Sequence, residues 1–330
     1  MIPTAWANSG RFGQGLVNWL NTLRPHRLLL ENVLGIHRDK RLPPFARPTF
    51  TAWFRQQTGG AEETPDGTHP VVLFATCYAT YNKPALAQAA YEVLRHNDCR
   101  IACPSLHCCG MPALDGGNVA FAQQQARHNV ERLLPFVSRG YPIAVINPTC
   151  SLMLKQEYPE LLDVPDNPQL ATAARQVAAA TRDICEFLFE LRQAGHFKED
   201  FRSTPGGPVA YHAPCHLRMQ NIGFRGRDLM RRIPQVQPRL VAECSGHDGT
   251  WSMKREYFAW SLQNGQKAFD GMRQSGAELW TTDCPLAALH FEQACGKPAL
   301  HPIEVLARAY RPDGFPHPLT PQSNPPESAA

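Results

Sequence analysis

Long apolar runs are missing from this sequence, and so are several other features that would fix a function. No stretch approaches the roughly 20 apolar residues of a membrane-spanning helix. The N-terminus lacks the charged and apolar regions of a secretory signal. The net charge is only +4 with no long basic block, so a nucleic-acid partner is not expected. No G-x-G-x-x-G follows the first expected strand, so NAD binding is not predicted.

Cysteine, in contrast, is plentiful, with 11 residues in a chain of 330. A hydrophobic content of 43% and a charged content of 19% are typical of a globular protein. Without a secretory signal the expected compartment is reducing, where cysteines serve as ligands or catalysts more often than as disulfides. The expected location is the cytoplasm, with peripheral attachment at the inner face of the cell membrane as a variant.

Seven of the cysteines form two sets with matching spacing. Steps of 31 and 41 residues separate the lone cysteines from the adjacent pair in the first set, and steps of 29 and 39 separate the corresponding positions in the second. Two similar sets indicate an internal duplication, and thiolates are ligands for iron–sulfur clusters or zinc. The first thiol set is Cys77, Cys108, Cys109 and Cys150, and the second thiol set is Cys215, Cys244 and Cys284.

The chain divides into five segments. Residues 1–58 are expected to be helical, with leucines and Trp19 on one face, and residues 59–70 form a polar loop. Residues 71–200 and 201–310 alternate short apolar strands with helices and are predicted to be two α/β domains. Residues 311–330 hold many prolines and few apolar residues, so a disordered tail is predicted.

The lone cysteines follow expected strands. In an open parallel sheet the functional crevice lies beyond the carboxyl ends of the strands, so the thiols of one set are expected to converge there. The glycines after the pair positions, Gly110 and Gly246, allow a tight turn around a bulky ligand. The four strands that run into a lone cysteine are VVLFATC (71–77), PIAVINPTC (142–150), GPVAYHAPC (207–215) and AELWTTDC (277–284).

Together these residues resemble the duplicated cysteine-rich CCG-domain family of iron–sulfur proteins. That family includes the B subunit of heterodisulfide reductase, lactate-utilisation proteins and the C subunit of anaerobic glycerol-3-phosphate dehydrogenase, and the likeness is strongest to the C-terminal part of the last. It covers about residues 20–310. The strings that carry it include PTCSLMLKQEYPELL (148–162), HAPCHLRM (212–219), DCPLAALHFE (283–292) and HPIEVLARAY (301–310).

The resemblance implies two tandem Rossmann-like CCG domains with parallel sheets, preceded by an N-terminal helical segment. It also implies a [4Fe-4S] cluster on the first thiol set and a second cluster on the second set. The sequence departs from the family pattern because Met153 and Ala287 replace the last cysteines of C-x-x-C, Ser245 replaces a paired cysteine, and no cysteine precedes Cys77.

A cubane cluster takes four thiolates, which the first set supplies and the second does not. The candidate replacements in the second half are His212, His216, His247 and Asp248. The competing interpretation is that the second half is a decayed copy that only packs on the first. The cysteines outside both sets are expected to be core thiols, namely Cys99, Cys103, Cys185 and Cys295.

Three functions compete at this point. The first is an iron–sulfur electron-transfer subunit that relays electrons between a partner flavoprotein or ferredoxin-like protein and quinone, a membrane subunit or another acceptor. The second is a cluster-based disulfide reductase that uses an open coordination position in the second half. The third is a zinc-binding assembly module, since three cysteines and one histidine make a closed zinc site. The order given is the order of preference.

Overall fold

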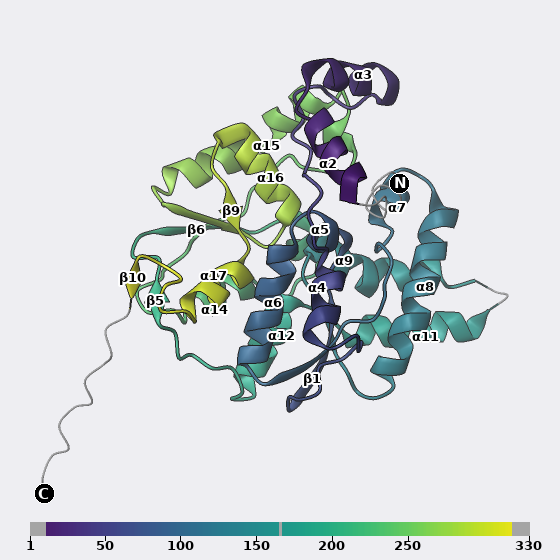
Figure 1. Ribbon diagram of the computed structural model, residues 1–330, viewed down its shortest axis with the longest axis vertical. Coiled ribbons are helices and arrows are strands. Elements are labelled where there is room, and N and C mark those ends of the chain that lie inside the picture. The colour runs from purple at the N-terminus through teal and green to yellow at the C-terminus, as the bar shows by residue number, and fades with distance from the viewer. Residues whose placement is uncertain (1–10, 165–166, 319–330) are drawn as a thin grey trace, which may run out of the picture.

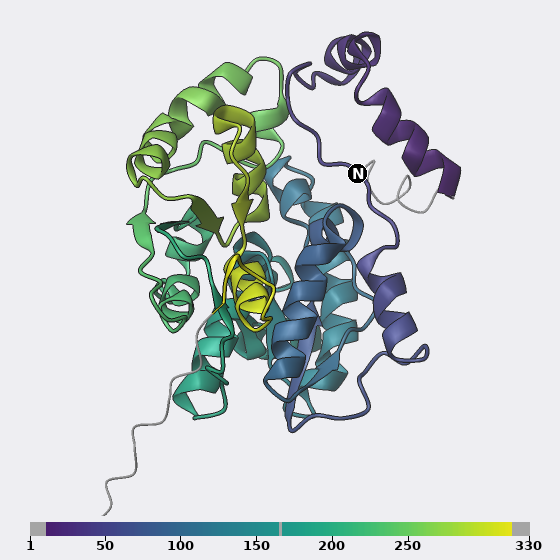
Figure 2. The ribbon, with the colours of Figure 1, turned by 60° about the vertical axis from the view of Figure 1, so that its left-hand side comes forward.

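A computed structural model describes residues 11–164 and 167–318 of the chain. It begins with α2 (Arg11–Leu20), α3 (Arg24–Leu34) and α4 (Phe50–Gln57). These helices confirm the predicted N-terminal helical segment, whose first ten residues lie outside the described part. Helices α2 and α3 stand at the top of the molecule, away from the two sheets (Figures 1 and 2).

Two four-stranded parallel sheets form the body of the protein. The first has the order β2-β1-β3-β4 and the second the order β7-β6-β8-β9, so each strand has a counterpart in the other sheet. The shared order confirms two parallel-sheet halves with the same topology. The strands are β1 (His69–Phe74), β2 (Cys99–Ala102), β3 (Ile143–Val145), β4 (Thr181–Asp183), β6 (Val209–His212), β7 (Arg239–Val241), β8 (Leu279–Thr282) and β9 (Ala299–Leu300).

The central strands are apolar because helices cover both faces of each sheet. Val71, Val72 and Leu73 of β1 are fully buried, and Val72 lies between Ala102 of β2 and Ile143 of β3 in the sheet register. In the first half the helical elements are α5 (Cys77–Tyr81), α6 (Pro84–His96), α7 (Met111–Asp115), α8 (Val119–Val137), α9 (Pro148–Leu152), the π-helix η1 (Met153–Glu157), α10 (Tyr158–Leu161), α11 (Pro168–Ala180) and α12 (Ile184–Gln193).

The second half has fewer helices, and its last one crosses to the first half. Helix α17 (Pro302–Ala309) packs on α6, while α12 of the first half packs on α14 (Arg225–Met230) of the second. One core therefore spans both halves, with Leu86 and Leu94 of α6 beside Ile303 and Leu306 of α17. The second-half helical elements are α13 (Cys215–Met219), α14 (Arg225–Met230), the 3-10 helix η2 (Trp251–Met253), α15 (Phe258–Gln274), α16 (Pro285–Cys295) and α17 (Pro302–Ala309).

The chain following α17 pairs back onto the second half. His317 and Pro318 form β10 (His317–Pro318), which is antiparallel to β5 (Ser203–Thr204). The predicted disordered tail therefore begins with residues that the structure places, while its residues 319–330 lie outside the described part. No helix among the described residues is long and apolar enough to cross a membrane.

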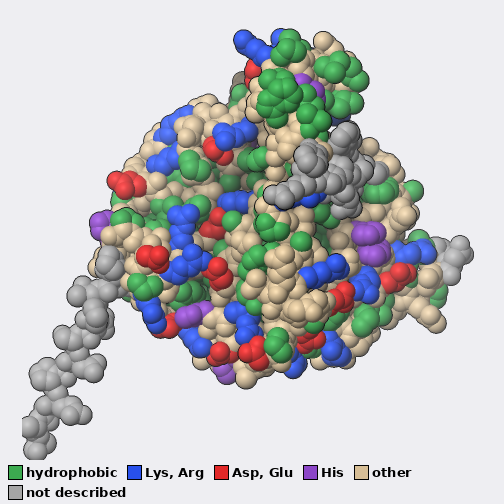
Figure 3. Space-filling view, viewed as in Figure 1, with side chains coloured by type: hydrophobic (Ala, Val, Ile, Leu, Met, Phe, Trp, Pro, Cys, Tyr) green, Lys and Arg blue, Asp and Glu red, His purple; other side chains and the backbone are tan. Residues whose placement is uncertain are grey.

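The leucine face predicted for the N-terminal segment is exposed. Apolar side chains gather over α2 and α3 at the top of the molecule (Figure 3). Leu16 and Trp19 of α2 are 54% and 57% exposed, and Val33 of α3 is 68% exposed. These side chains do not pack into the protein.

Candidate metal centre

The cysteines that follow strands lie at the starts of helices, a few residues beyond the strand ends. Cys77 opens α5, where Thr76 caps the helix by accepting from the backbone N–H of Ala79. Cys150 lies in α9, which Asn147 caps, and Cys284 is itself the cap of α16. Free N–H groups at a helix start can hydrogen-bond to a metal-bound sulfur, so these positions suit cysteines that bind a cation.

The thiols of the first set converge, as the strand pattern predicts. The sulfurs of Cys77 and Cys108 lie 3.8 Å apart. Interaction with the thiols of Cys109 and Cys77 lowers the pKa of Cys108 to about 3. The same interactions raise the pKa values of Cys77 and Cys109, and Cys150 contributes to both increases. A group of mutually interacting thiols with one stabilised thiolate is a donor set suited to iron or zinc.

Two buried polar residues hold the loop that carries the adjacent cysteines. Asn129 of α8 is fully buried; its Nδ2 donates to the carbonyl of Cys108 at 3.2 Å and its Oδ1 accepts from the backbone N–H of His107. The hydroxyl of Tyr158 donates to the carbonyl of Cys109 at 3.0 Å. Sequence reasoning missed both residues, although Asn129 is a polar residue on the apolar face of a predicted helix. They position the two thiols from behind the loop.

A pocket of about 560 Å³ opens onto the first thiol set. Cys77 and Cys108 line it, together with Phe121 of α8, and α4 supplies another wall. Cys109 and Cys150 are only 3% and 5% exposed. Thr76, beside Cys77, has φ of 64°, a positive value that a β-branched residue rarely adopts. The backbone is thus strained where it presents the first thiol.

The glycines after the pair positions have the conformation that a tight turn requires. Gly110 has φ of 97° and Gly246 has φ of 73°. A Cβ at Gly246 would lie 2.0 Å from the carbonyl oxygen of Ser261, whereas the nearest atoms to a Cβ at Gly110 are 3.4 Å away. The two positions therefore share a backbone requirement and differ in the space around them.

We expect Gly246→Ala to destabilise the protein more than Gly110→Ala does. The positive φ costs about 1 kcal/mol at either position, and the backbone clash at Gly246 raises the total to about 3 kcal/mol. The free energy of unfolding in urea measures both. Equal losses in the two variants would contradict the steric argument.

The second thiol set is more open than the first. Cys215 and Cys244 are exposed, while Cys284 is buried. Burial raises the pKa of Cys284 to about 12, and its sulfur accepts from the backbone N–H of Ala287 at 3.4 Å. Burial and the neighbouring Cys244 raise the pKa of Cys215. These three thiols lie at one end of the second sheet, with no thiol–thiol contact among them as close as that between Cys77 and Cys108.

The four candidate replacement ligands have different surroundings. Both ring nitrogens of His212 are engaged, by Thr282 at 2.9 Å and by the carbonyl of Glu243 at 3.0 Å. His216 Nδ1 lies 2.8 Å from the hydroxyl of Thr149 in the first half. His247 Nδ1 lies 3.3 Å from Ser252 Oγ, while its Nε2 is buried without a hydrogen-bond partner. Asp248 is exposed, and among these four residues His247 is the one with a buried ring nitrogen that lacks a hydrogen-bond partner.

A lysine from the N-terminal segment reaches the same region. Lys40 is 6% exposed, and its Nζ lies 3.2 Å from His290 Nδ1 and 3.3 Å from Ser252 Oγ. Burial lowers the pKa of Lys40 to about 8 and that of His247 to about 3. Arg27 fixes this part of the chain by donating to the carbonyls of His37, Arg38 and Lys40.

The cysteine-bearing ends of the two halves meet. Helix α9, with Cys150, packs on α13, which begins at Cys215. Gln220, the residue after α13, donates to the carbonyl of Pro148 at 3.0 Å and lies 2.9 Å from Ser151. The two thiol sets are therefore neighbours across the junction, not sites at opposite ends of the molecule.

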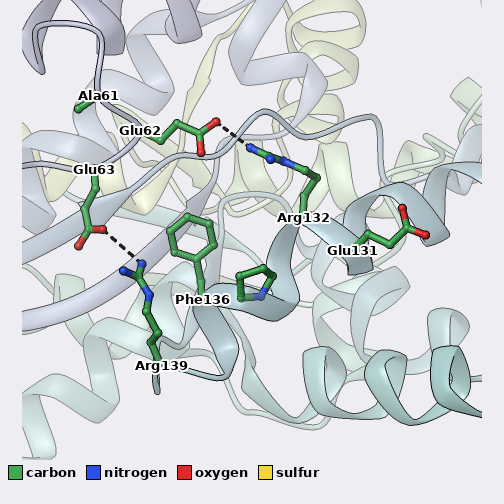
Figure 4. A pocket seen from close by; sticks show the side chains of 8 residues that line it. Ala61, Glu62, Glu63, Glu131, Arg132, Phe136 and Arg139 are labelled. Atoms are coloured by element: carbon green, nitrogen blue, oxygen red, sulfur yellow. Dashed lines mark hydrogen bonds and ion pairs between the residues drawn. The ribbon is translucent and has the colours of Figure 1, made fainter.

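The remaining cysteines lie outside both sets. Cys99 and Cys185 are fully buried, as expected for core thiols. Cys103 lines the same pocket as Cys77 and Cys108, and Cys295 is half-buried at the end of α16. A separate surface pocket, between the loop before β1 and α8, contains no cysteine (Figure 4). Its walls are joined by the ion pairs Arg132–Glu62 and Arg139–Glu63.

Two parallel-sheet halves that present thiols at adjoining sheet ends define a class of duplicated cysteine-rich proteins. The model of the cysteine-rich domain CCG matches residues 71–155 and again residues 209–292. The chain belongs to this CCG family.

Several curated relatives are similar over most of the chain. The C subunit of anaerobic glycerol-3-phosphate dehydrogenase from Escherichia coli strain K12 is 30% identical over 301 residues, which cover 89% of this chain and 72% of the relative. The B subunit of fumarate reductase (CoM/CoB) from Methanothermobacter marburgensis is 26% identical, over 71% of this chain and 44% of the relative.

A third relative, the D subunit of dihydromethanophenazine:CoB–CoM heterodisulfide reductase from Methanosarcina barkeri, is 26% identical over 65% of this chain and 51% of the relative. All three are subunits of oxidoreductases by name. The matches confirm the predicted family and the predicted class, an iron–sulfur electron-transfer subunit of an oxidoreductase complex.

Proposed function

We propose that the first thiol set holds a [4Fe-4S] cluster and that the protein relays electrons through it between a partner redox subunit and quinone or another acceptor. The observation that carries this proposal is the convergence of the four thiols, with Cys77 and Cys108 in contact and Cys108 stabilised as a thiolate. A bound cluster would supply one-electron redox chemistry. Four cysteines are the donor number that a cubane cluster takes.

The protein's own residues set the conditions at this position. The hydrogen bonds of Asn129 and Tyr158 to the cysteine loop fix the thiols from behind, and the burial of Cys109 and Cys150 keeps water away from two of them. The pocket beside Cys77 and Cys108 leaves one side open to an electron donor or acceptor. The exposed apolar side chains of α2 and α3 support a partner protein that covers them.

For the second half we propose a site made by the second thiol set with His247 as a further ligand. The support is the buried, unpartnered Nε2 of His247, whose other nitrogen is held by Ser252. A histidine ligand is commonly oriented by a contact to its second nitrogen in this way. The exposure of Cys215 and Cys244 favours an alternative in which this half reacts with a disulfide substrate.

Anaerobic purification with iron, sulfide and EPR measurements tests the proposal. We expect iron and sulfide in the wild type, and a first-set EPR signal that persists in Cys244→Ala. If His247→Ala changes only the EPR signal of the second thiol set, His247 is a ligand of that set. A wild type free of iron and sulfide would overturn the electron-transfer proposal, and turnover of a disulfide that is lost in Cys244→Ala would favour the reductase instead.

A further inference from the structure

A group of buried donor side chains lies between the two halves, apart from both thiol sets. Asp183 ends β4 and caps α12, Cys185 lies in the first turn of α12, and Asp283 follows β8. All three are fully buried. One carboxylate oxygen of each aspartate and the sulfur of Cys185 lie within 4.8 Å of one another. Two halves of the chain thus contribute ligand atoms to one point.

Several polar atoms at this point have no hydrogen-bond partner. They are Oδ2 of Asp183, both carboxylate oxygens of Asp283 and the hydroxyl of Tyr211. Tyr211 belongs to β6, is fully buried, and its hydroxyl faces Asp283. The Tyr211 hydroxyl and the Cys185 thiol both face Asp283 and favour its carboxylate form, whereas Oδ2 of Asp183 has no donor near it. A buried carboxylate without a full set of partners costs several kcal/mol, so the two aspartates together indicate a missing partner.

No side-chain cation of the described chain supplies that partner. The ion pairs found over residues 11–164 and 167–318 include neither Asp183 nor Asp283, and the nearby Lys155 pairs with Glu186 at 2.5 Å. Two carboxylates this close in a dry environment repel each other unless they share a proton or bind a metal ion.

A glycine in α14 makes room for the carboxylate of Asp283. A Cβ at Gly226 of α14 would lie 2.6 Å from Oδ1 of Asp283 and 2.7 Å from Cγ of Pro302. Only a glycine allows α14 to approach this closely. The close approach to Pro302 is part of the packing of α14 on α17 within the second half.

We propose that Asp183, Cys185 and Asp283 bind a zinc ion that links the two halves. Zinc accepts carboxylate oxygen and cysteine sulfur in one site, whereas magnesium and calcium prefer oxygen alone. The ion would satisfy the unpartnered carboxylate oxygens and balance the two carboxylates. Its ligands are separate from those proposed for iron, so the proposal stands whether or not the thiol sets hold clusters.

Metal analysis of the anaerobically purified full chain tests this site. We expect about one zinc ion per chain in the wild type and in Cys99→Ser, which changes a buried thiol elsewhere. Asp183→Asn, Asp283→Asn and Cys185→Ser should each reduce zinc at least tenfold while iron is unchanged. Asparagine retains the cap of α12, because Oδ1 of residue 183 can still accept from the backbone N–H of residue 185.

X-ray absorption at the zinc edge separates this site from zinc trapped by the thiol sets, and it needs only the wild type. We expect one sulfur ligand and two or more oxygen ligands. Zinc surrounded by three or four sulfurs would overturn the proposal. The proposal would also be overturned by a wild type that contains no zinc, shows no rise in unfolding temperature when zinc is added, and is as stable as Asp283→Asn. That result would mean that the two carboxyls share a proton instead of binding a metal ion.

Discussion

Cys109→Ala is expected to remove the iron held by the first half, about four ions per chain. Cys109 is the most buried thiol of the first set, and it interacts with both Cys108 and Cys150. Its removal leaves three thiols, and alanine offers no atom that can replace the lost sulfur. Iron analysis, visible absorbance and EPR of anaerobically purified protein measure the loss.

The matched control is Cys99→Ala, which removes an equally buried thiol from β2. We expect Cys99→Ala to keep the iron content and the EPR signal of the wild type. If Cys109→Ala also keeps both, the first thiol set is not the ligand set. If both variants lose iron, the loss reports a damaged fold, and the circular dichroism spectra will show it.

Acid is expected to destabilise the protein, and His301 is expected to account for about 2 kcal/mol of the loss between pH 7 and pH 5. His301 is 2% exposed; Nδ1 accepts from the backbone N–H of Ile303 and Nε2 lies 3.1 Å from the carbonyl of Ile146 in the first half. Burial lowers its pKa from 6.5 to about 3. The unfolded chain therefore binds a proton below pH 6.5 that the folded chain does not.

The sign of this effect follows from the direction of the shift. His301 stabilises the fold as a neutral ring above pH 6.5, and that contribution is lost as the pH falls from 6.5 towards 3. His301→Asn removes the titration, and asparagine can still cap α17. Urea unfolding of cluster-free protein at pH 7 and pH 5 should therefore show a smaller loss for the variant.

The difference between the wild type and His301→Asn leaves out the contributions of the other titrating groups near the junction, because both proteins contain them. His212 and His290 also have pKa values lowered by burial, to about 4, and add acid sensitivity to both proteins. In protein stripped of all metal, burial raises the pKa of Asp283 to about 6, which acts in the opposite direction in both. A variant with the same pH dependence as the wild type would show that His301 is not buried as a neutral ring.

The sequence predicts the elements with strong local patterns. The apolar spacing of VAFAQQQARHNVERLLPFV is that of a single helix, and α8 spans it from Val119 to Val137. The strands ahead of the lone cysteines are found within a few residues of their predicted positions. Strands β4 and β9 were missed because they are three and two residues long. Such short strands are specified by pairing with neighbours, and their own composition carries little signal.

The site is predictable only in part for the same reason. The convergence of the first thiol set follows from strand ends in one sheet, which the cysteine spacing reveals. The support from Asn129 and the meeting of Asp183 with Asp283 depend on contacts across about 20 to 100 residues, which no local pattern records. In α2 and α3 the local pattern is informative but incomplete. Periodicity predicts their apolar face, but it does not predict what covers that face.

Because α17 packs on α6, the core of the first half cannot be completed until nearly the whole chain has been synthesised. Helix α6 belongs to the first half, yet the apolar side chains that cover it are made almost last. When synthesis has reached only residue 200, the face of α6 that α17 covers is therefore still exposed to solvent. A chain that ends before Pro302 lacks α17 and leaves the apolar face of α6 exposed to solvent.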